Sequence, residues 1–505
     1  WPARIAETAL WLTDHQMNTE LSLATGNLFQ RIPLRAAPHI RCANALRMDW
    51  NELIPAKECS CILGNPPFVG AKYQTSEQKE DVKHVAGQMN NSGLLDYVAM
   101  WYFKAADYIR GGDIRCAFVS TNSISQGEQV GVLWSELFNR GVKIHFAHRT
   151  FAWQSEARGK AHVHVVIIGF GMNDKPGKTI YEYDTLNGNP SAIAVINIAP
   201  YLIEGANITI NNRSKPICNA PEIGIGNKPI DGGNYLFETQ EKDDFVMKEP
   251  GAATYFRPWI GSEEFLHGKH RWCLWLGDAS PQEIARLPEC KKRIQAVQQF
   301  RFSSKSAPTR KLAETPRRFH VENFPKGEYL VLPEVSSEKR PYIPIGYLSP
   351  PTLCSNLVKI IPNANIYHFG ILTSAMHMAW VRQVCGRLES RYRYSAKLVY
   401  NNYPWPVDAT AEQREKVAEC ARDVLDVRQD YLTKGATLAD LYDPLTMPPP
   451  LLMAHHALDR AVDRCYRPRK FNSERERVEF LFGLYEKITT PLAPIAPLKK
   501  TRGAQ

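Results

Sequence analysis

Short apolar runs alternate with helical patterns over the first 185 residues of the chain. An apolar run bounded by polar positions is typical of a buried strand, and such runs predict strands at 59–63, 114–120, 144–148 and 163–170. Between them, apolar residues recur at helical spacing and predict helices over 1–17, 94–110 and 129–140. This alternation predicts a doubly wound α/β sheet of parallel strands, where ligands bind at the carboxyl ends of the strands. A helix as apolar as 1–17 normally follows a strand on which it packs, so we expect a first strand upstream of Trp1.

The pattern changes twice further along the chain. Residues 186–250 are rich in Asn, Gly and Pro and predict irregular connections with short strands, and residues 250–405 are mixed. Helical spacing returns and predicts helices over 409–434, 450–466 and 475–488. We therefore expect three domains with boundaries at 1–185, 186–406 and 407–505: an α/β domain, a mixed α+β domain and a helical C-terminal domain with a frayed tail.

Composition narrows the class of protein. The chain has 505 residues, 44% of them hydrophobic and 23% charged, which is close to the globular average and excludes collagen-like, disordered and disulfide-scaffold proteins. Lys and Arg outnumber Asp and Glu by 62 to 52, and the net charge of +10 suits a polyanionic partner. No apolar run approaches the ~18 residues of a membrane span, so no membrane partner is expected. The 11 scattered cysteines predict free thiols in a reducing cytoplasm.

The most informative stretch is Gly64-Asn65-Pro66-Pro67-Phe68, directly after a predicted strand. The amino group of a purine ring is a poor nucleophile because its lone pair is delocalised into the ring. An amide oxygen and a backbone carbonyl that accept its two hydrogens localise that pair on nitrogen, and Asn65 and Pro66 offer these acceptors. The prolines make the loop rigid, and Phe68 offers a face for stacking an extruded base. The alternative is an ordinary turn after a strand.

These residues resemble the catalytic motif of the adenine-N6 DNA methyltransferases of class I, which use S-adenosylmethionine. The stretches ARIAETALWLTDHQMN, NALRMDW, GNPPFVGAKYQ, FVSTNSISQGEQV, FAWQSEARGKAHVHVVIIGF and RYRYSAKLVYNNYPWP occur in this order and resemble the MmeI-like branch. That branch is of the type IIG restriction–modification kind, and one bacterial or archaeal polypeptide holds a methyltransferase, a target recognition domain and often a nuclease. The resemblance implies a Rossmann-like methyltransferase sheet at 1–185, a target recognition domain at 186–406 and double-stranded DNA as the partner.

The resemblance also implies roles for single residues. The catalytic tetrad matches Asn65, Pro66, Pro67 and Phe68. Asp49 matches the acid that binds the adenine amino group of S-adenosylmethionine, with Trp50 beside that ring; the alternative for Asp49 is a helix N-cap or a solvated acid in a loop. Either Phe151 or Trp153 matches the aromatic residue that stacks on the flipped base, and an aromatic core pair is the alternative.

One part of the family pattern is absent from the sequence. The glycine-rich cofactor loop and the acid that binds the ribose are expected before Trp1, so the resemblance predicts a fragment without its N-terminal part. The later string Gly224-Ile225-Gly226 has no strand-to-helix setting and is no substitute.

A basic, aromatic stretch at 386–403 predicts DNA contacts. Arginine reads guanine edges, lysine and tyrosine reach phosphates, and Glu389 can accept from a cytosine amino group. The candidates for DNA contact are Arg387, Glu389, Arg391, Arg393 and Lys397, with Tyr392, Tyr394 and Tyr400 among them. The alternative is a solvated helix face. A second basic run predicts either a loop that follows phosphates or a plain charged surface, and it comprises Arg301, Lys305, Arg310, Lys311, Arg317 and Arg318.

Other candidates point to structure rather than chemistry. Cys59 and Cys61 have no second pair at zinc spacing and are expected to be core cysteines, and His455-His456 lacks a carboxylate partner, so no metal is predicted. Lys160, His162 and His164 alternate along a predicted strand and mark one face of it. Ser120, Ser123 and Ser125 have no nucleophile-elbow setting.

The sequence therefore predicts a site-specific DNA methyltransferase that transfers a methyl group from S-adenosylmethionine to the amino group of adenine. Two other functions remain. One is a DNA-binding specificity module without catalysis, and the other is a methyltransferase that acts on RNA or on a protein glutamine, because the same loop serves any planar amino group.

Overall fold

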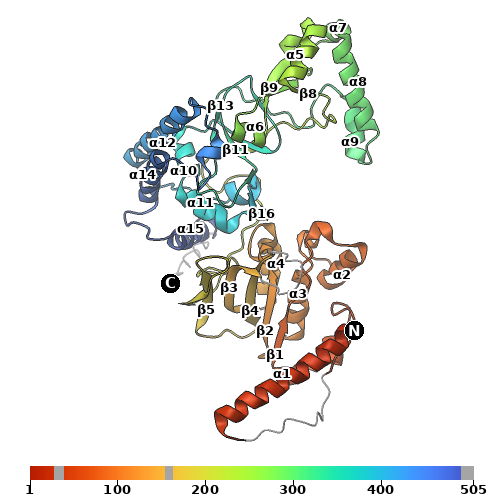
Figure 1. Ribbon diagram of the computed structural model, residues 1–505, viewed down its shortest axis with the longest axis vertical. Coiled ribbons are helices and arrows are strands. Elements are labelled where there is room, and N and C mark those ends of the chain that lie inside the picture. The colour runs from red at the N-terminus through yellow and green to blue at the C-terminus, as the bar shows by residue number, and fades with distance from the viewer. Residues whose placement is uncertain (28–38, 154–162, 491–505) are drawn as a thin grey trace, which may run out of the picture. The chain divides into compact units, whose positions relative to one another are not determined.

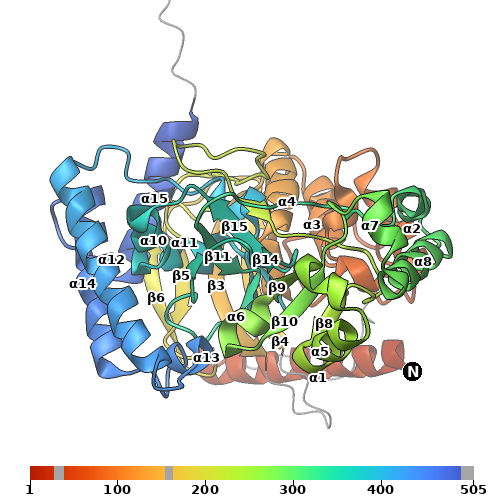
Figure 2. The same cartoon turned by 90° about the horizontal axis from the view of Figure 1, so that it is seen from above.

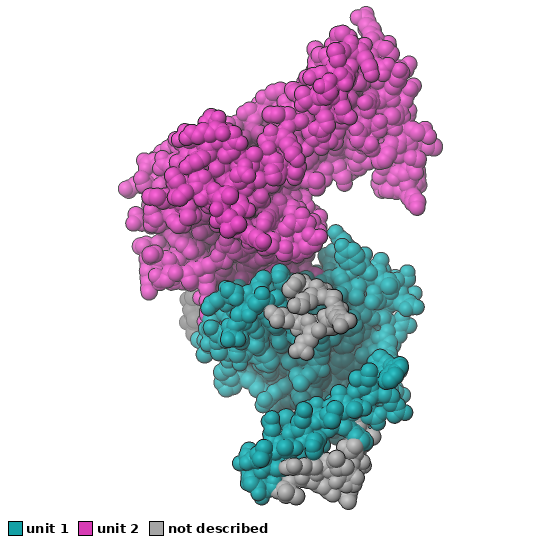
Figure 3. Space-filling model, viewed as in Figure 1, with its two compact units in different colours: residues 1–124, 131–198 teal, residues 125–130, 199–505 magenta. Residues whose placement is uncertain are grey.

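The computed structural model describes residues 1–27, 39–153 and 163–490, and its elements are shown in Figure 1 and from above in Figure 2. The chain divides into two compact units, which Figure 3 colours separately. Unit 1 comprises residues 1–124 and 131–198, and unit 2 comprises residues 125–130 and 199–505.

Unit 1 is built on a six-stranded sheet with the order β1-β2-β4-β3-β5-β6 (Figure 1). Its strands are β1 (Cys61–Gly64), β2 (Arg115–Thr121), β3 (Lys143–Trp153), β4 (Val163–Gly171), β5 (Lys178–Tyr183) and β6 (Pro190–Val195). Its helices are α1 (Pro2–Thr25), α2 (Ser76–Ala86), α3 (Ala99–Tyr108) and α4 (Glu128–Asn139). The four predicted strands and the three predicted helices are confirmed, although α1 is longer and α3 shorter than expected.

The sheet is mixed rather than wholly parallel. β1 pairs with β2 in parallel and so does β3 with β5, but β4 lies between β2 and β3 and is antiparallel to both. Consecutive strands joined by a short connection pair antiparallel, because a parallel pair needs a long crossover. The short spacing between β3 and β4 therefore accounts for the departure from the predicted parallel sheet.

An aromatic core holds α3 and α4 on this sheet. Tyr102 of α3 stacks on Phe170 of β4 at 5.2 Å and meets Phe118 of β2 edge-on at 5.2 Å. Trp134 of α4 is fully buried, and its indole donates to the carbonyl of Ile124 at 2.8 Å. This packing fixes the helices that precede and follow β2.

The prediction that 59–63 is a buried strand is wrong. β1 has one neighbour among the described strands, and its alternating pattern leaves Leu63 77% exposed. Cys61 is exposed and Cys59 half-buried, so neither is the core cysteine that the sequence predicts. Helix α1 is also largely exposed, because Ser22 is its only buried residue.

Unit 2 contains three small sheets. Their strand orders are β14-β9-β10-β8, β13-β11-β15-β7 and β12-β17-β16. The bounds of the strands are β7 (Gly224–Ile225), β8 (Leu236–Glu238), β9 (Phe256–Ile260), β10 (Arg271–Leu274), β11 (Tyr329–Pro333), β12 (Val335–Ser336), β13 (Gly346–Leu348), β14 (Leu353–Cys354), β15 (Val358–Pro362), β16 (Gly386–Leu388) and β17 (Arg391–Arg393).

The helices of unit 2 fall into two groups. The first group flanks the β9 sheet and comprises α5 (Thr239–Lys248), α6 (Ser262–His267), α7 (Pro281–Ala285), α8 (Pro288–Phe302) and α9 (Ala307–Lys311). The second comprises α10 (Ile366–Leu372), α11 (Ala375–Val384), α12 (Ala411–Leu432), α13 (Leu438–Leu441), α14 (Pro449–Tyr466) and α15 (Glu474–Thr489). α12 and α14 lie side by side, as Figure 2 shows. Among the described residues, no helix combines the length and apolar character that a membrane crossing requires.

Two histidines are buried in unit 2 without a cationic role. His377 is fully buried, with its Nε2 3.0 Å from the hydroxyl of Tyr394. His455 is stacked on Tyr342 at 4.0 Å, and its Nε2 lies 3.0 Å from the hydroxyl of Tyr442. Burial lowers the pKa of each imidazole to about 3. They pack as neutral rings that are partnered by tyrosine hydroxyls.

These lowered pKa values predict acid sensitivity. Between pH 6.5 and pH 3 the unfolded chain binds a proton at His377 that the folded chain does not, so stability falls as the pH falls. From pH 7 to pH 5 this one histidine is expected to cost about 2 kcal/mol of unfolding free energy. His377→Gln should remove that part of the pH dependence in urea unfolding curves. The exposed His267→Gln is the control, and identical pH slopes for wild type and His377→Gln would contradict the assignment.

Candidate active site

The register of the sheet places Asn65, Phe151 and Trp153 at the same edge. Gly64 is the last residue of β1 and pairs with Phe118 of β2, so the next residue, Asn65, leaves the sheet at its carboxyl edge. Across β2, β4 and β3, Thr121 is opposite Val165, which is opposite Phe151. The antiparallel direction of β4 thus brings the end of β3 to the edge where β1 and β2 end.

The loop after β1 presents an amide and hides a proline. The side chains of Asn65 and Pro67 are exposed, Pro66 is buried and Phe68 is half-buried. The amide of Asn65 makes no hydrogen bond to the described residues, so both its oxygen and its nitrogen remain available. The loop is anchored where it ends, because the Val69 carbonyl accepts a hydrogen bond from the backbone N–H of Tyr97 at 2.9 Å. The loop is therefore anchored at its end, while the Asn65 side chain within it keeps its hydrogen-bonding groups available.

Asp49 is both an N-cap and an open acceptor. It caps the 3-10 helix Trp50–Glu52, and its Oδ1 accepts from the backbone N–H of Asn51 at 2.9 Å and from the Asn51 amide at 3.1 Å. These hydrogen bonds lower the pKa of Asp49, so the carboxylate is ionised at neutral pH. Its Oδ2 accepts nothing from the described residues. The N-cap alternative is correct, and it leaves one oxygen free for an amine.

Trp50 lies beside this carboxylate in a fixed orientation. Its indole nitrogen donates to the carbonyl of Ala45 at 2.8 Å, and its ring meets Tyr108 edge-on at 5.6 Å. The indole is half-buried, so part of its surface can contact a ligand.

Phe151 belongs to an aromatic group on β3 and β5. Its ring stacks on Tyr183 at 4.9 Å, while His148 stacks on Tyr181 at 4.2 Å. Trp153 has a single ring contact among the described residues, with Phe151 at 6.3 Å. Both candidates lie at the edge of the sheet where Asn65 lies, but a neighbour already covers one face of Phe151.

The second group of candidates lies on a hairpin of unit 2, not on a helix. β16 and β17 pair antiparallel, and Glu389 occupies the turn with a φ of 58°. Arg391 is exposed and its guanidinium lies 2.7 Å from Glu389, whereas exposed Arg393 is 3.0 Å from Glu334. The Arg387 guanidinium lies 4.0 Å over the ring of Tyr392. The helix-face alternative is therefore wrong for residues 386–393.

The tyrosines of this stretch do not reach outward. Tyr392, Tyr394 and Tyr400 are 3%, 1% and 0% exposed. Tyr392 takes the buried face of β17, because alternate residues of a strand point to opposite faces, and Tyr400 is buried on the short helix Ala396–Tyr400. Their prediction as phosphate contacts is wrong. Lys397 is exposed on the short helix Ala396–Tyr400.

The second basic run also contains both buried and exposed side chains. Arg301 is fully buried on α8 and donates to backbone carbonyls at 2.7 to 2.9 Å; the acceptors are Pro229, Ile230, Leu312, Thr315 and Arg318. Arg317 donates to the carbonyl of Ala279 at 2.6 Å. Both arginines hold loops together, and the fully buried Arg301 cannot contact phosphates. Lys305, Arg310 and Lys311 are exposed.

The remaining candidates are structural. Gly224-Ile225 is part of strand β7, and a Cβ on Gly226 would lie 2.4 Å from the carbonyl oxygen of Cys354, so this glycine serves close backbone packing. Ser120 is buried and its hydroxyl lies 2.9 Å from that of Tyr102. His164 lies on β4, and Lys160 and His162 lie outside the described residues. No group of three metal-ligating side chains occurs within the described ranges.

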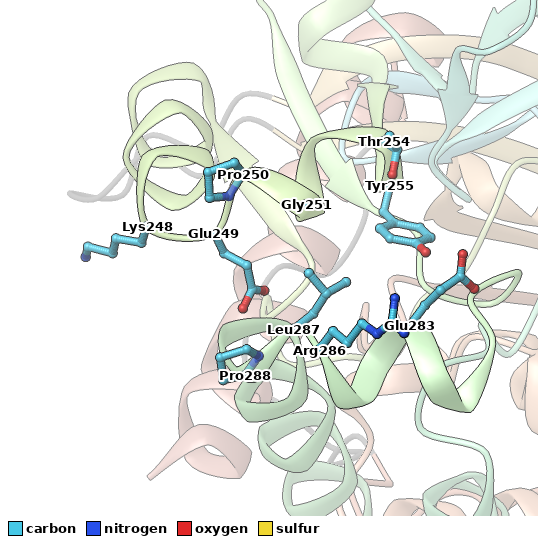
Figure 4. Close-up of a pocket in the computed structure, with 10 residues that line it drawn as sticks. All are labelled: Lys248, Glu249, Pro250, Gly251, Thr254, Tyr255, Glu283, Arg286, Leu287 and Pro288. Carbon is cyan, nitrogen blue, oxygen red and sulfur yellow. The ribbon is translucent and has the colours of Figure 1, made fainter.

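Unit 2 has a surface groove of about 520 Å³ (Figure 4), and none of the predicted site residues lines it. It is lined by Lys248, Glu249, Pro250, Gly251, Thr254, Tyr255, Glu283, Arg286, Leu287 and Pro288. The carboxylate of Glu249 accepts from the backbone N–H groups of Glu289 and Cys290 at 2.8 and 2.9 Å, at the start of α8. Glu249, one of the charged residues that line the groove, thus caps the start of α8.

Two buried carboxylates escape the sequence analysis. Asp81 and Asp96 are 2% and 9% exposed, and both hydrogen bond to segments next to Asp49 or Asn65. A charged residue inside an apolar stretch, such as Asp96 in LLDYVAM, is the signal that could have identified them.

Comparison with known proteins covers almost the whole chain. Residues 1–182 match the model of the MmeI DNA-methyltransferase domain, 204–407 the MmeI target recognition domain, and 409–493 the MmeI C-terminal domain. DNA methyltransferase A of Bacillus subtilis (strain 168) is 42% identical over 489 residues, which are 96% of this chain and 54% of that protein. The structure of the type IIL restriction-modification enzyme MmeI in complex with DNA is similar at 50% identity with a TM-score of 0.83, covering 97% of this chain and 65% of that one. The chain thus spans about half the length of the curated relative.

The buried guanidinium of Arg301 gives a stability prediction. Arg301→Ala leaves several buried carbonyls without donors and opens a cavity, so the free energy of unfolding should fall by about 3–5 kcal/mol. Arg301→Lys should restore little, because one ammonium group cannot reach acceptors spread over a planar fork. Urea unfolding measures both, with exposed Arg310→Ala as the control. An Arg301→Ala protein of wild-type stability but weakened DNA binding would show that this arginine contacts phosphates after all.

Proposed function

The chain belongs to the MmeI family of DNA methyltransferases, and from this premise we propose that it transfers a methyl group from S-adenosylmethionine to the exocyclic amino group of adenine in duplex DNA. The observation that carries the proposal is the Asn65-Pro66-Pro67-Phe68 loop at the carboxyl edge of the sheet, with its exposed and uncommitted amide. The similarity to MmeI in complex with DNA supports duplex DNA as the partner.

The role of the loop follows from the acceptors that it offers. The Asn65 amide oxygen and the Pro66 carbonyl accept the two N–H groups of the target amino group, which localises its lone pair for attack. Pro66 is buried and the Pro67 ring that follows restricts the ψ of Pro66, which keeps the Pro66 carbonyl in place. Phe68 stacks on the flipped base. Trp153 is the preferred second stacking residue, since Tyr183 already covers one face of Phe151.

The residues around Asp49 fit the adenine end of the methyl donor. The free Oδ2 of the ionised Asp49 suits an exocyclic amine, and the exposed part of the Trp50 indole suits the ring. When bound, S-adenosylmethionine supplies an electrophilic methyl group. Asp49 and Trp50 would orient the donor by its adenine end and take no part in proton transfer.

The β16–β17 hairpin and its surroundings are proposed to read the target sequence. Arg391 and Glu389 lie at the exposed turn and suit contacts to base edges, whereas Arg393 and Lys397 suit phosphates. The Arg387 guanidinium packs over the ring of Tyr392, so its main role is to stabilise the hairpin. Contact with DNA is secondary for this residue. We further propose a cytoplasmic restriction–modification setting, with domain boundaries near 185 and 406.

The central test is substitution of Asn65. Asn65→Ala removes one acceptor and should lower the methyl-transfer rate at least about 100-fold, since removing one preorganised hydrogen-bonding partner has costs of this order. DNA affinity should change little, because the exposed amide supports no described contact. Tritiated methyl transfer from S-adenosylmethionine to mixed genomic DNA measures the rate, and hydrolysis to nucleosides locates the label.

The outcomes separate the candidate functions. Label in adenine that disappears with Asn65→Ala supports the proposal, and retained methylation by this variant would refute the mechanism. Transfer only to RNA or protein would support the alternative substrates. Tight DNA binding with no label from the wild type would support the specificity module without catalysis.

The hairpin gives a second prediction about specificity. Arg391→Ala should weaken binding to the preferred site about 5- to 100-fold and relax the choice of base at one position. Lys397→Ala should weaken binding to all sequences equally and lower the salt dependence of the affinity by about one counterion. Sequencing of methylated sites and binding titrations at several salt concentrations measure the two effects. Arg422→Ala, exposed on α12 and paired with Glu415 at 3.1 Å, is the matched control. Uniform weakening by Arg391→Ala with an unchanged site preference would contradict base reading.

A further inference from the structure

Asp96 connects the loop that follows β1, which contains Asn65, with the segment that follows β2. Its Oδ1 accepts from the backbone N–H of Ala71 at 3.0 Å, shortly after residues 65–68. Its Oδ2 accepts from the hydroxyl of Ser123 at 2.5 Å, directly after β2. The side chain is buried, so these donors stabilise a charge that would otherwise be costly to bury.

The adjacent Tyr97 extends this connection in the other direction. Its backbone N–H donates to the carbonyl of Val69 at 2.9 Å, which fixes the end of the Asn65 loop a second time. Its hydroxyl donates to Asp81 of α2 at 2.6 Å. One tyrosine thus contacts the target loop with its backbone and α2 with its side chain.

Asp81 holds the segment that leads to Asp49 and Trp50. Its Oδ2 accepts from the Asn44 amide at 3.0 Å and its Oδ1 from the Nε of Arg47 at 2.5 Å. Burial alone would raise the pKa of Asp81, but the hydrogen bonds from Tyr97, Arg47 and Asn44 outweigh it and leave the pKa below its usual value. Between these two anchors, the Ala45 carbonyl accepts the hydrogen bond from the Trp50 indole at 2.8 Å.

The bonds of these carboxylates distinguish them from ordinary core polar groups. Each carboxylate accepts hydrogen bonds from segments beside the proposed site. Well-packed apolar side chains would fill the core at least as stably, so stability alone does not account for these two acids. Hydrogen bonds join Ser123 to Asp96 on one side, and Tyr97 through Asp81 to Asn44 and Arg47 on the other, and the peptide bond between Asp96 and Tyr97 connects the two sets.

We propose that Asp96 and Asp81 are positioning residues, Asp96 for the Asn65 loop and Asp81 for Asp49 and Trp50, and that Tyr97 joins them so that the two ring-binding segments keep a fixed separation. The proposal rests on the proposed function, because it assigns the two segments to the target adenine and to the adenine of the methyl donor. Methyl transfer needs both rings at a set distance, and a displacement of about 1 Å can cost about 100-fold in rate.

Two variants should affect different kinetic constants. Asp96→Ala frees the target loop, so kcat for methyl transfer should fall at least about 10-fold while the KM for S-adenosylmethionine stays within about twofold. Asp81→Ala frees the 44–47 segment, so that KM should rise about 10-fold with kcat at saturation within about twofold. Asp96→Asn keeps an acceptor for Ala71 and should restore most of kcat. Merely structural damage would move both constants together and would not be rescued by Asn.

Hydrogen–deuterium exchange gives a readout that does not need activity. Asp96→Ala should speed exchange in residues 65–75 and not in 44–52, and Asp81→Ala should do the reverse, while strand β2 stays protected in both. Asp81→Asn replaces Asp81→Ala if the latter fails to fold. Equal loss of protection in both segments, or in neither, would overturn the proposal. A wild type without methyl transfer would refute the proposed function alone, because the exchange pattern would still test whether the carboxylates hold their segments.

Discussion

A Cβ on Gly64 would lie 3.1 Å from the ring of Phe118, closer than ordinary van der Waals contact. Phe118 has little room to move aside, because it is 2% exposed and packs against the rings of both Tyr102 and Phe170. Close parallel pairing of β1 with β2 therefore favours glycine at the last position of β1. The same pairing determines where the chain leaves the sheet, and so where Asn65 and the loop behind it can be. The anchors of Val69 and Ala71 act on a loop whose starting point this contact has already fixed.

The sequence predicts an element well where local forces decide it. The helices expected at 409–434, 450–466 and 475–488 lie at Ala411–Leu432, Pro449–Tyr466 and Glu474–Thr489, because an apolar stripe and local caps such as the Thr410 capping box define them. Pairing partners are not local. Neither the antiparallel direction of β4 nor the exposure of β1 follows from its own residues, since both depend on which strands come to lie beside it.

The same limit applies to the candidate site. The Asn65 loop could be predicted because a short rigid motif carries its chemistry by itself, and the exposed amide agrees with that expectation. Charge, by contrast, says little about location. Arg301 and Lys305 look alike in the sequence, yet one is buried among carbonyls and the other is exposed. Asp96 was missed for the converse reason, because its importance comes from donors at Ala71 and Ser123 that are distant along the chain.

The alternation along and just after β17 separates the residues that pack in the core from those proposed to contact DNA. Tyr392 and Tyr394 take the buried face, and Arg391 and Arg393 take the exposed one. The buried pair holds the hairpin against its neighbours, while the turn at Glu389 can vary without opening a cavity in the core. Mutations of Arg391 consequently carry little penalty in stability, whatever they do to binding, whereas Arg393 also pairs with the largely buried Glu334. A lineage under pressure to change its target can explore this surface by single substitutions, and each intermediate remains a folded protein on which selection can act.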